Sequence, residues 1–144
     1  MTRQEFVLMA MAAGHGDAHT AVQVQKLLFL IERKVPQVIG GPHFTFVPDA
    51  FGPLDLEVYA ELSAASAKGL VSIYNERDTV RIYCLTSAGR AVGEAMLAKL
   101  KPETAEYLRT LSAWVRRQGF WKLVSAVYHA YPEMRVNGVF QERL

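Results

Sequence analysis

The sequence contains very little cysteine and no long apolar run. Its 144 residues include one cysteine, Cys84, which excludes an intrachain disulfide and fits a reducing compartment. No apolar stretch approaches the roughly 20 residues that a membrane-spanning helix needs, and no basic leader precedes an apolar run. We therefore expect a cytoplasmic protein with no membrane segment, stabilised by an ordinary hydrophobic core.

The sequence also lacks the short motifs of common enzyme and metal sites. It has no HExxH or CxxC pair, no glycine-rich phosphate loop and no nucleophile elbow. The segment HGDAH at residues 15–19 offers three ligand types on one loop, which is more typical of a turn between helices than of a metal site. Cys84 alternates with Val80 and Ile82, which predicts a small buried side chain. We expect no metal, no cofactor and no enzymatic activity.

Net charge is low and unevenly distributed. The formal charge of +2 is too small to favour non-specific binding to nucleic acid. Residues 1–86 hold seven Lys and Arg against nine Asp and Glu, whereas residues 87–144 hold nine against five. The first part is therefore mildly acidic and the second mildly basic.

Hydrophobic periodicity predicts an α+β chain that is mostly helical. The helical patterns cover residues 2–13, 20–35, 54–68, 87–99, 103–117 and 120–131. Alternation predicts a short strand at residues 44–46 and a β-hairpin at residues 71–84 with the polar turn Asn75–Asp78. Three helices followed by a hairpin are typical of a winged helix. We expect one domain over residues 1–144, with a winged-helix body at 1–86 and a C-terminal helical extension at 87–144.

Local signals support these boundaries. Thr20 and Thr86 are suitable N-caps, and Gly69 lies where a helix C-cap belongs. Pro53 is well placed at a turn or at a helix start. In the second helix the apolar residues form one broad face, and the polar residues are expected to point elsewhere: Gln23, Gln25, Lys26, Glu32 and Arg33.

Several stretches together resemble a known family. These are VQKLLFLIE (Val24–Glu32), FVPDAFGPLDLEVYAELSAASAKGLV (Phe46–Val71), YCLTSAGRAV (Tyr83–Val92) and LVSAVYHAYPEM (Leu123–Met134). Their pattern is similar to that of the YwgA-like and SocA-like winged-helix proteins, a group that borders the Panacea-domain antitoxins. The resemblance implies a protein-binding role, either neutralising a toxin or acting as an adaptor that passes a client to a protease.

The helix at residues 54–68 is where many winged helices carry their DNA-reading residues. Here it presents Asp55, Glu57 and Glu61, and its first basic residue is Lys68. Carboxylates near a row of phosphates are repulsive and forfeit counterion release. These carboxylates are either a solvated helix face or part of a partner-binding face.

The protein-binding hypothesis combines this acidic helix with the exposed part of the preceding FGP turn. An acidic rim steers a basic partner and an aromatic anchor supplies affinity. Tyr59 is either such an anchor or a core residue. We expect a basic, toxin-like client at Phe51, Gly52, Pro53, Asp55, Glu57, Tyr59 and Glu61.

The C-terminal helices are rich in apolar and aromatic residues. The set is Trp114, Val115, Phe120, Trp121, Leu123, Val124, Val127 and Tyr128. They either cover the winged-helix body or leave an exposed remainder that forms a homodimer seam. The alternative function is a DNA-binding transcriptional or phage-linked regulator. Its candidate contacts are Lys68, Arg77, Arg81, Arg116, Arg117 and Lys122.

Overall fold

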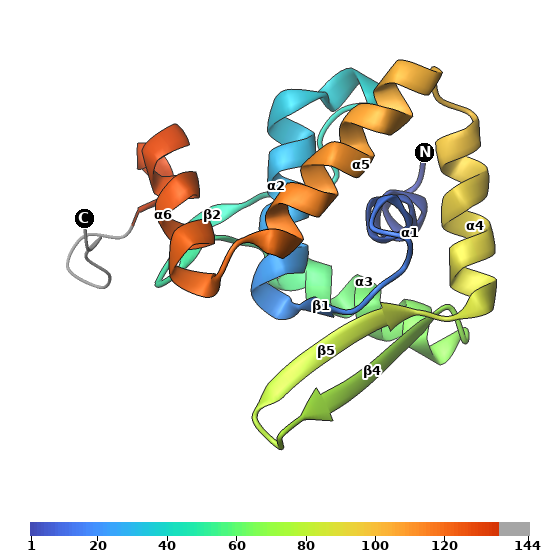
Figure 1. Cartoon of the computed structure of the whole chain (residues 1–144), viewed down its shortest axis with the longest axis horizontal. Helices are drawn as coiled ribbons and strands as arrows, with labels where there is room; N and C mark the ends of the chain where they lie inside the picture. Colours follow the sequence, from blue (N-terminus) through green and yellow to red (C-terminus); the bar gives the residue numbers. More distant parts are fainter. Residues whose placement is uncertain (136–144) are drawn as a thin grey trace.

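Six α-helices, two small antiparallel sheets and two short 3₁₀ turns make up residues 1–135, the part of the chain that this computed structural model describes (Figure 1). The helices are α1 (Arg3–Ala13), α2 (Ala21–Lys34), α3 (Leu56–Ala67), α4 (Ser87–Ala98), α5 (Pro102–Arg117) and α6 (Phe120–Ala130). The strands are β1 (His19–Thr20), β2 (Val47–Asp49), β3 (Gly52–Leu54), β4 (Val71–Glu76) and β5 (Val80–Leu85). The prediction of a mostly helical α+β chain is confirmed.

Helix α1 lies at the centre of the molecule. Its sequence is apolar on every side after the first turn, and all residues from Phe6 to Ala13 are buried. Helix α4 packs along α1, and α5 lies across α1 and α2 (Figure 1). A helix that is hydrophobic all round is stable in water only when neighbours cover it, which explains why the C-terminal helices are needed to close this core.

Helix α2 is covered more completely than its pattern predicts. Gln25, Lys26 and Glu32 are 1%, 3% and 9% exposed, so the expectation that they face away from the interior is wrong. One side of α2 packs against α1 and α5, and another side faces β3, which covers positions that a simple amphipathic helix would expose. Three polar side chains are therefore buried, and each needs an explanation.

The predicted helix caps are present. Thr20 forms a capping box with Gln23 at the start of α2, and the Thr86 hydroxyl accepts a hydrogen bond from the Gly89 amide at the start of α4. Gly69 follows α3 with a φ of +77°, which is the left-handed conformation that a C-terminal glycine supplies. These local signals fix the helix ends independently of tertiary packing.

The larger sheet has the strand order β1-β5-β4. Its β4–β5 hairpin extends beyond the helices (Figure 1), so Val80 near the tip is 43% exposed although Ile82 is buried. Cys84 is half-buried and its thiol donates a hydrogen bond to the Gly16 carbonyl at 3.2 Å. The expectation of a buried stripe is therefore wrong at Val80, which adjoins the turn at the tip of the hairpin, and is met only in part at Cys84, which lies near the base.

The smaller sheet differs from the prediction. The strand expected at residues 44–46 begins instead at Val47, and β2 pairs with β3 so that Val47 lies opposite Leu54. The Phe44 and Phe46 rings are 5.9 Å apart and pack toward the core. Their alternation thus reflects burial of an irregular segment. Pro53 lies within β3, not at a helix start, and α3 begins at Leu56.

No helix within residues 1–135 has the length and apolar character needed to cross a bilayer.

Candidate functional site

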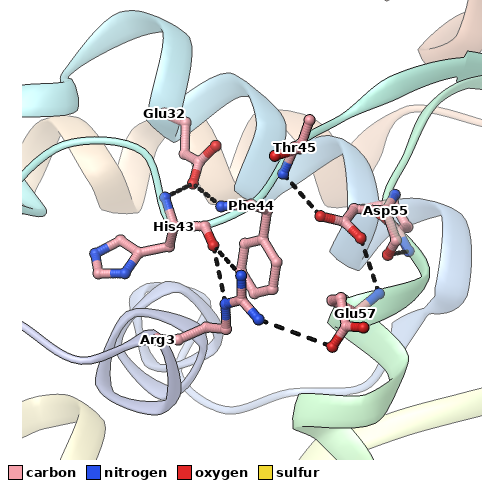
Figure 2. Close-up of polar contacts among 8 residues, drawn as sticks. Arg3, Glu32, His43, Phe44, Thr45, Asp55 and Glu57 are labelled. Carbon is pink, nitrogen blue, oxygen red and sulfur yellow. Dashed lines mark hydrogen bonds and ion pairs between the residues drawn. The ribbon is translucent and has the colours of Figure 1, made fainter.

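Two acidic residues at the start of α3, Asp55 and Glu57, have partners elsewhere in the fold (Figure 2). Asp55 is the N-cap of α3, and its carboxylate accepts hydrogen bonds from the amides of Glu57 at 2.9 Å and Thr45 at 2.7 Å. The backbone of Asp55 is also bonded in both directions to the Gln25 side-chain amide. Asp55 therefore joins α2, α3 and the segment before β2, and its carboxylate is already satisfied.

Glu57 and Glu61 are freer than Asp55. Glu57 is exposed and lies 3.8 Å from the Arg3 guanidinium, a separation at which an exposed pair contributes little stability. Glu61 is half-buried. Arg3 also donates two hydrogen bonds to the His43 carbonyl. The acidic part of α3 that remains available to a partner is thus Glu57, with Glu61 beside it.

Buried Glu32 supports the same region from the other side. Its carboxylate accepts hydrogen bonds from the amides of His43 at 2.6 Å and Phe44 at 3.0 Å (Figure 2). Burial raises the pKa of Glu32, and these two hydrogen bonds oppose that shift. Glu32 therefore fixes the segment that leads into β2.

The structure brings four predicted partner-binding residues to one pocket. Phe51, Gly52, Pro53 and Tyr59 line a cavity of about 260 Å³ together with Val22, Gln25, Lys26, Asp49 and Leu54. We call this cavity the Lys26 pocket. Gly52 and Pro53 are buried, so Phe51 is the exposed part of the FGP turn. Tyr59 is half-buried and packs on the core with its ring stacked on Tyr83. It is therefore partly a core residue and partly available as an interface anchor.

Lys26 is the unexpected member of this pocket. Only 3% of the residue is exposed, and within residues 1–135 its ammonium has neither a hydrogen-bond acceptor nor an ion-pair partner. Burial lowers the pKa of Lys26 to about 8, with the more distant Asp49 carboxylate acting in the opposite direction. In the sequence, Lys26 stands within the apolar run Val24–Ile31, and this position could have indicated burial. The amphipathic pattern of the helix predicted instead that the lysine faces solvent.

Three exposed aromatic side chains cluster beside the pocket. The Phe51 ring centroid lies 5.2 Å from that of Phe120 and 6.1 Å from that of Trp121, and the Phe120 and Trp121 centroids are 4.6 Å apart, all edge to face. They are 43%, 40% and 58% exposed, respectively. We call these three residues the aromatic cluster. The two sequence regions assigned separately to partner binding and to a dimer seam thus form one surface.

The rest of the C-terminal apolar set packs inward. Trp114 is half-buried, and the others are buried, namely Val115, Leu123, Val124, Val127 and Tyr128. Most of this set therefore covers the body, and Phe120 and Trp121 are its exposed remainder.

The basic residues considered for DNA binding are dispersed. Arg116 lies 3.4 Å from the Asp17 carboxylate and donates to the Gly14 carbonyl, so it holds the α1–β1 turn. Lys68, Arg77, Arg81, Arg117 and Lys122 are exposed. The β4–β5 turn and the α5–α6 junction, which carry most of them, lie apart in the molecule (Figure 1).

The HGDAH turn does not assemble ligands. His19 is buried and its Nδ1 lies 2.7 Å from the Asp17 carbonyl, whereas His15 is exposed with a φ of 60°. Within the described residues, no group of three or more His, Cys, Asp or Glu side chains could hold a metal ion. Comparison with known proteins adds no assignment, since neither a protein-family model nor a curated protein sequence matches the chain.

Proposed function

We propose that this chain is a non-enzymatic protein-interaction module of winged-helix type, acting as an antitoxin or proteolytic adaptor that binds a toxin-like client. The observation that carries the proposal is the aromatic cluster of Phe51, Phe120 and Trp121. Large aromatic side chains are costly to leave in water and are the usual anchors of protein interfaces. Three of them packed against one another form a preorganised anchor.

The charge of α3 favours a basic client over DNA. The exposed residues in the first two turns of α3 include Leu56, which is 69% exposed, and Glu57, and the helix has no basic residue before Lys68. A helix of this composition would repel phosphates in a groove, whereas Glu57 and Glu61 would attract a basic protein. The winged-helix assignment rests on the order of α1, α2 and α3 before the β4–β5 hairpin, with β1 paired to β5.

A matched pair of variants tests this proposal. Wild-type protein, Trp121→Ala and Tyr74→Ala are each used to capture partners from a nuclease-treated lysate of the native cell. Tyr74 is 46% exposed on the β4–β5 hairpin, outside the aromatic cluster, and is a control for loss of an exposed ring. We expect one protein to be retained by wild type and Tyr74→Ala and lost with Trp121→Ala. Glu57→Lys combined with Glu61→Lys should weaken the same capture.

Two results would overturn the proposal. Equal capture by wild type and Trp121→Ala would show that the aromatic cluster is not the interface. Recovery of a specific DNA from untreated lysate, abolished by Arg77→Glu with Arg81→Glu, would establish the regulator function instead. Sedimentation of wild type and Trp121→Ala tests for a homodimer. If wild type self-associates and Trp121→Ala does not, the aromatic cluster binds a second copy of this chain.

A further inference from the structure

The Lys26 ammonium is the starting point of a second, independent inference. The Lys26 residue is 3% exposed, its ammonium has no acceptor among residues 1–135, and a charge held largely away from water is costly unless something pairs with it. It borders a cavity, and its pKa is held at about 8, below the ordinary value for lysine. The cavity therefore offers space for an anion beside the Lys26 ammonium.

The walls of the pocket determine what kind of partner fits. Gln25 is unavailable because both atoms of its amide bond the Asp55 backbone. Asp49 lies at the exposed edge. The other lining residues are apolar or aromatic, apart from the backbone of the turn: Val22, Phe51, Gly52, Pro53, Leu54 and Tyr59. One cation within apolar walls is suited to an anion carried on an apolar body.

Gly52 keeps the ammonium accessible. Its φ of +103° belongs to the region that favours glycine, and a Cβ at this position would lie 3.3 Å from both Cε and Nζ of Lys26. A side chain here would crowd the ammonium and fill the space beside it. The hairpin turn thus leaves Nζ facing the cavity.

The volume limits the ligand to a small group. About 260 Å³ is below the roughly 300–1,000 Å³ of pockets that hold drug-sized ligands. It suits an aryl or alkyl group with one carboxylate. We propose that the Lys26 pocket binds a carboxylate on a small apolar body, with the Lys26 ammonium as its counter-ion.

A matched pair of probes tests the charge requirement. The probes are 3-phenylpropionate and its neutral analogue 3-phenylpropionamide, titrated into protein labelled with ¹³C at the lysine side chains. We expect the carboxylate to shift the Lys26 Cε resonance and to raise the pKa of Lys26, with the amide binding at least about tenfold more weakly. Equal binding of the two probes, or no change at Lys26, would overturn the proposal.

Three variants test the residues. Lys26→Met should weaken 3-phenylpropionate binding by about tenfold or more, whereas Lys34→Met, an exposed position on the same helix, should leave it unchanged. Asp49→Asn removes the carboxylate that the described part of the chain places on the pocket lining and should strengthen binding by a few-fold. Unchanged binding to Lys26→Met, or weaker binding to Asp49→Asn, would contradict the assignment.

A further comparison asks whether the carboxylate belongs to a protein C-terminus or to a small organic acid. A short peptide ending in phenylalanine with a free terminus is compared with the same peptide amidated and with 3-phenylpropionate. Preference for the free-terminus peptide assigns the pocket to a protein C-terminus, and preference for 3-phenylpropionate assigns it to a small organic acid. Trp121→Ala should not change binding of 3-phenylpropionate, so failure of the protein-interaction proposal is distinguishable from failure of this one.

Discussion

The Asp55 carboxylate lies 2.7 Å from the Thr45 amide and accepts its hydrogen bond. The same carboxylate caps α3 through the Glu57 amide. One side chain thus connects the start of a helix to a segment ten residues earlier in the chain. This contact changes how the acidic helix is tested, because charge reversal at Asp55 would disturb the fold as well as the surface.

We predict that Asp55→Ala lowers the free energy of unfolding by about 1–2 kcal/mol, since it removes an N-cap and a hydrogen bond to an exposed amide. Asp55→Asn keeps one acceptor oxygen for the cap but places an NH2 group, which cannot accept a hydrogen bond, opposite the Thr45 amide, so it should cost about half as much. Urea denaturation of the two variants measures the difference. Equal losses would show that the helix cap contributes little, and that the charge and the bond to Thr45 account for the effect.

The sequence predicted those features of the molecule that depend on neighbouring residues. The caps Thr20 and Thr86 follow from local hydrogen bonding and are confirmed, whereas α3 begins at Leu56, two residues later than predicted. The structural role of Asp55 was not predicted, because its bond to Thr45 depends on the path of the chain before β2. Lys26 was misplaced because periodicity describes one face of a helix, whereas α2 is covered on more than one side.

We predict that Lys26→Met stabilises the protein. The pKa of Lys26 is lowered from an ordinary 10.5 to about 8 in the fold, so folding at neutral pH carries a cost of up to about 3 kcal/mol. Removing the charge should therefore raise the free energy of unfolding at pH 7 by on the order of 2–3 kcal/mol. This cost is present in full below pH 8 and disappears as the pH rises toward 10.5.

The comparison variant for Lys26 is Lys34→Met, at the exposed end of α2. It removes the same charge near a helix C-terminus and should cost no more than about 1 kcal/mol. Urea denaturation at pH 7 and pH 10 measures the change in unfolding free energy for both variants and its dependence on pH. A Lys26→Met protein less stable than wild type at pH 7 would mean that the ammonium already has a stabilising partner.

We predict that His19 makes the protein less stable in mild acid. Burial lowers the pKa of His19 from 6.5 to about 4, with the nearby Arg116 acting in the same direction and the Asp17 carbonyl opposing it. Between these values the unfolded chain takes up a proton that the folded chain does not. Stability from this residue is therefore complete above pH 6.5 and falls by up to about 3 kcal/mol as the pH drops to 4.

The matched variant is His19→Asn, whose amide nitrogen can reach the Asp17 carbonyl as Nδ1 does, without titrating. The measured quantity is the change in unfolding free energy between pH 6.5 and pH 4.5, in wild type and variant. Glu32 and the other carboxylates contribute equally to both proteins. We expect a steeper decline in wild type, and parallel pH profiles would contradict the assignment to His19.

Gly93 and Leu8 set the spacing between α4 and α1. A Cβ at Gly93 would collide with the Leu8 carbonyl and the Ala12 side chain, both on a central helix with no room to move. Helix propensity alone predicts that Gly93→Ala stabilises the protein by about 1 kcal/mol. Overpacking costs about 1–3 kcal/mol or more, and collision with backbone places this site at the upper end of that range.

We therefore expect Gly93→Ala to destabilise the protein by about 2–3 kcal/mol in urea denaturation, with steric collision outweighing propensity. Gly119→Ala is the control, since no atom of residues 1–135 outside its two chain neighbours lies within 4 Å of a Cβ built there and its φ is −68°. That change should shift stability by less than about 1 kcal/mol. A more stable Gly93→Ala protein would mean that α1 and α4 can separate at little cost, and that their close approach is not required by the core.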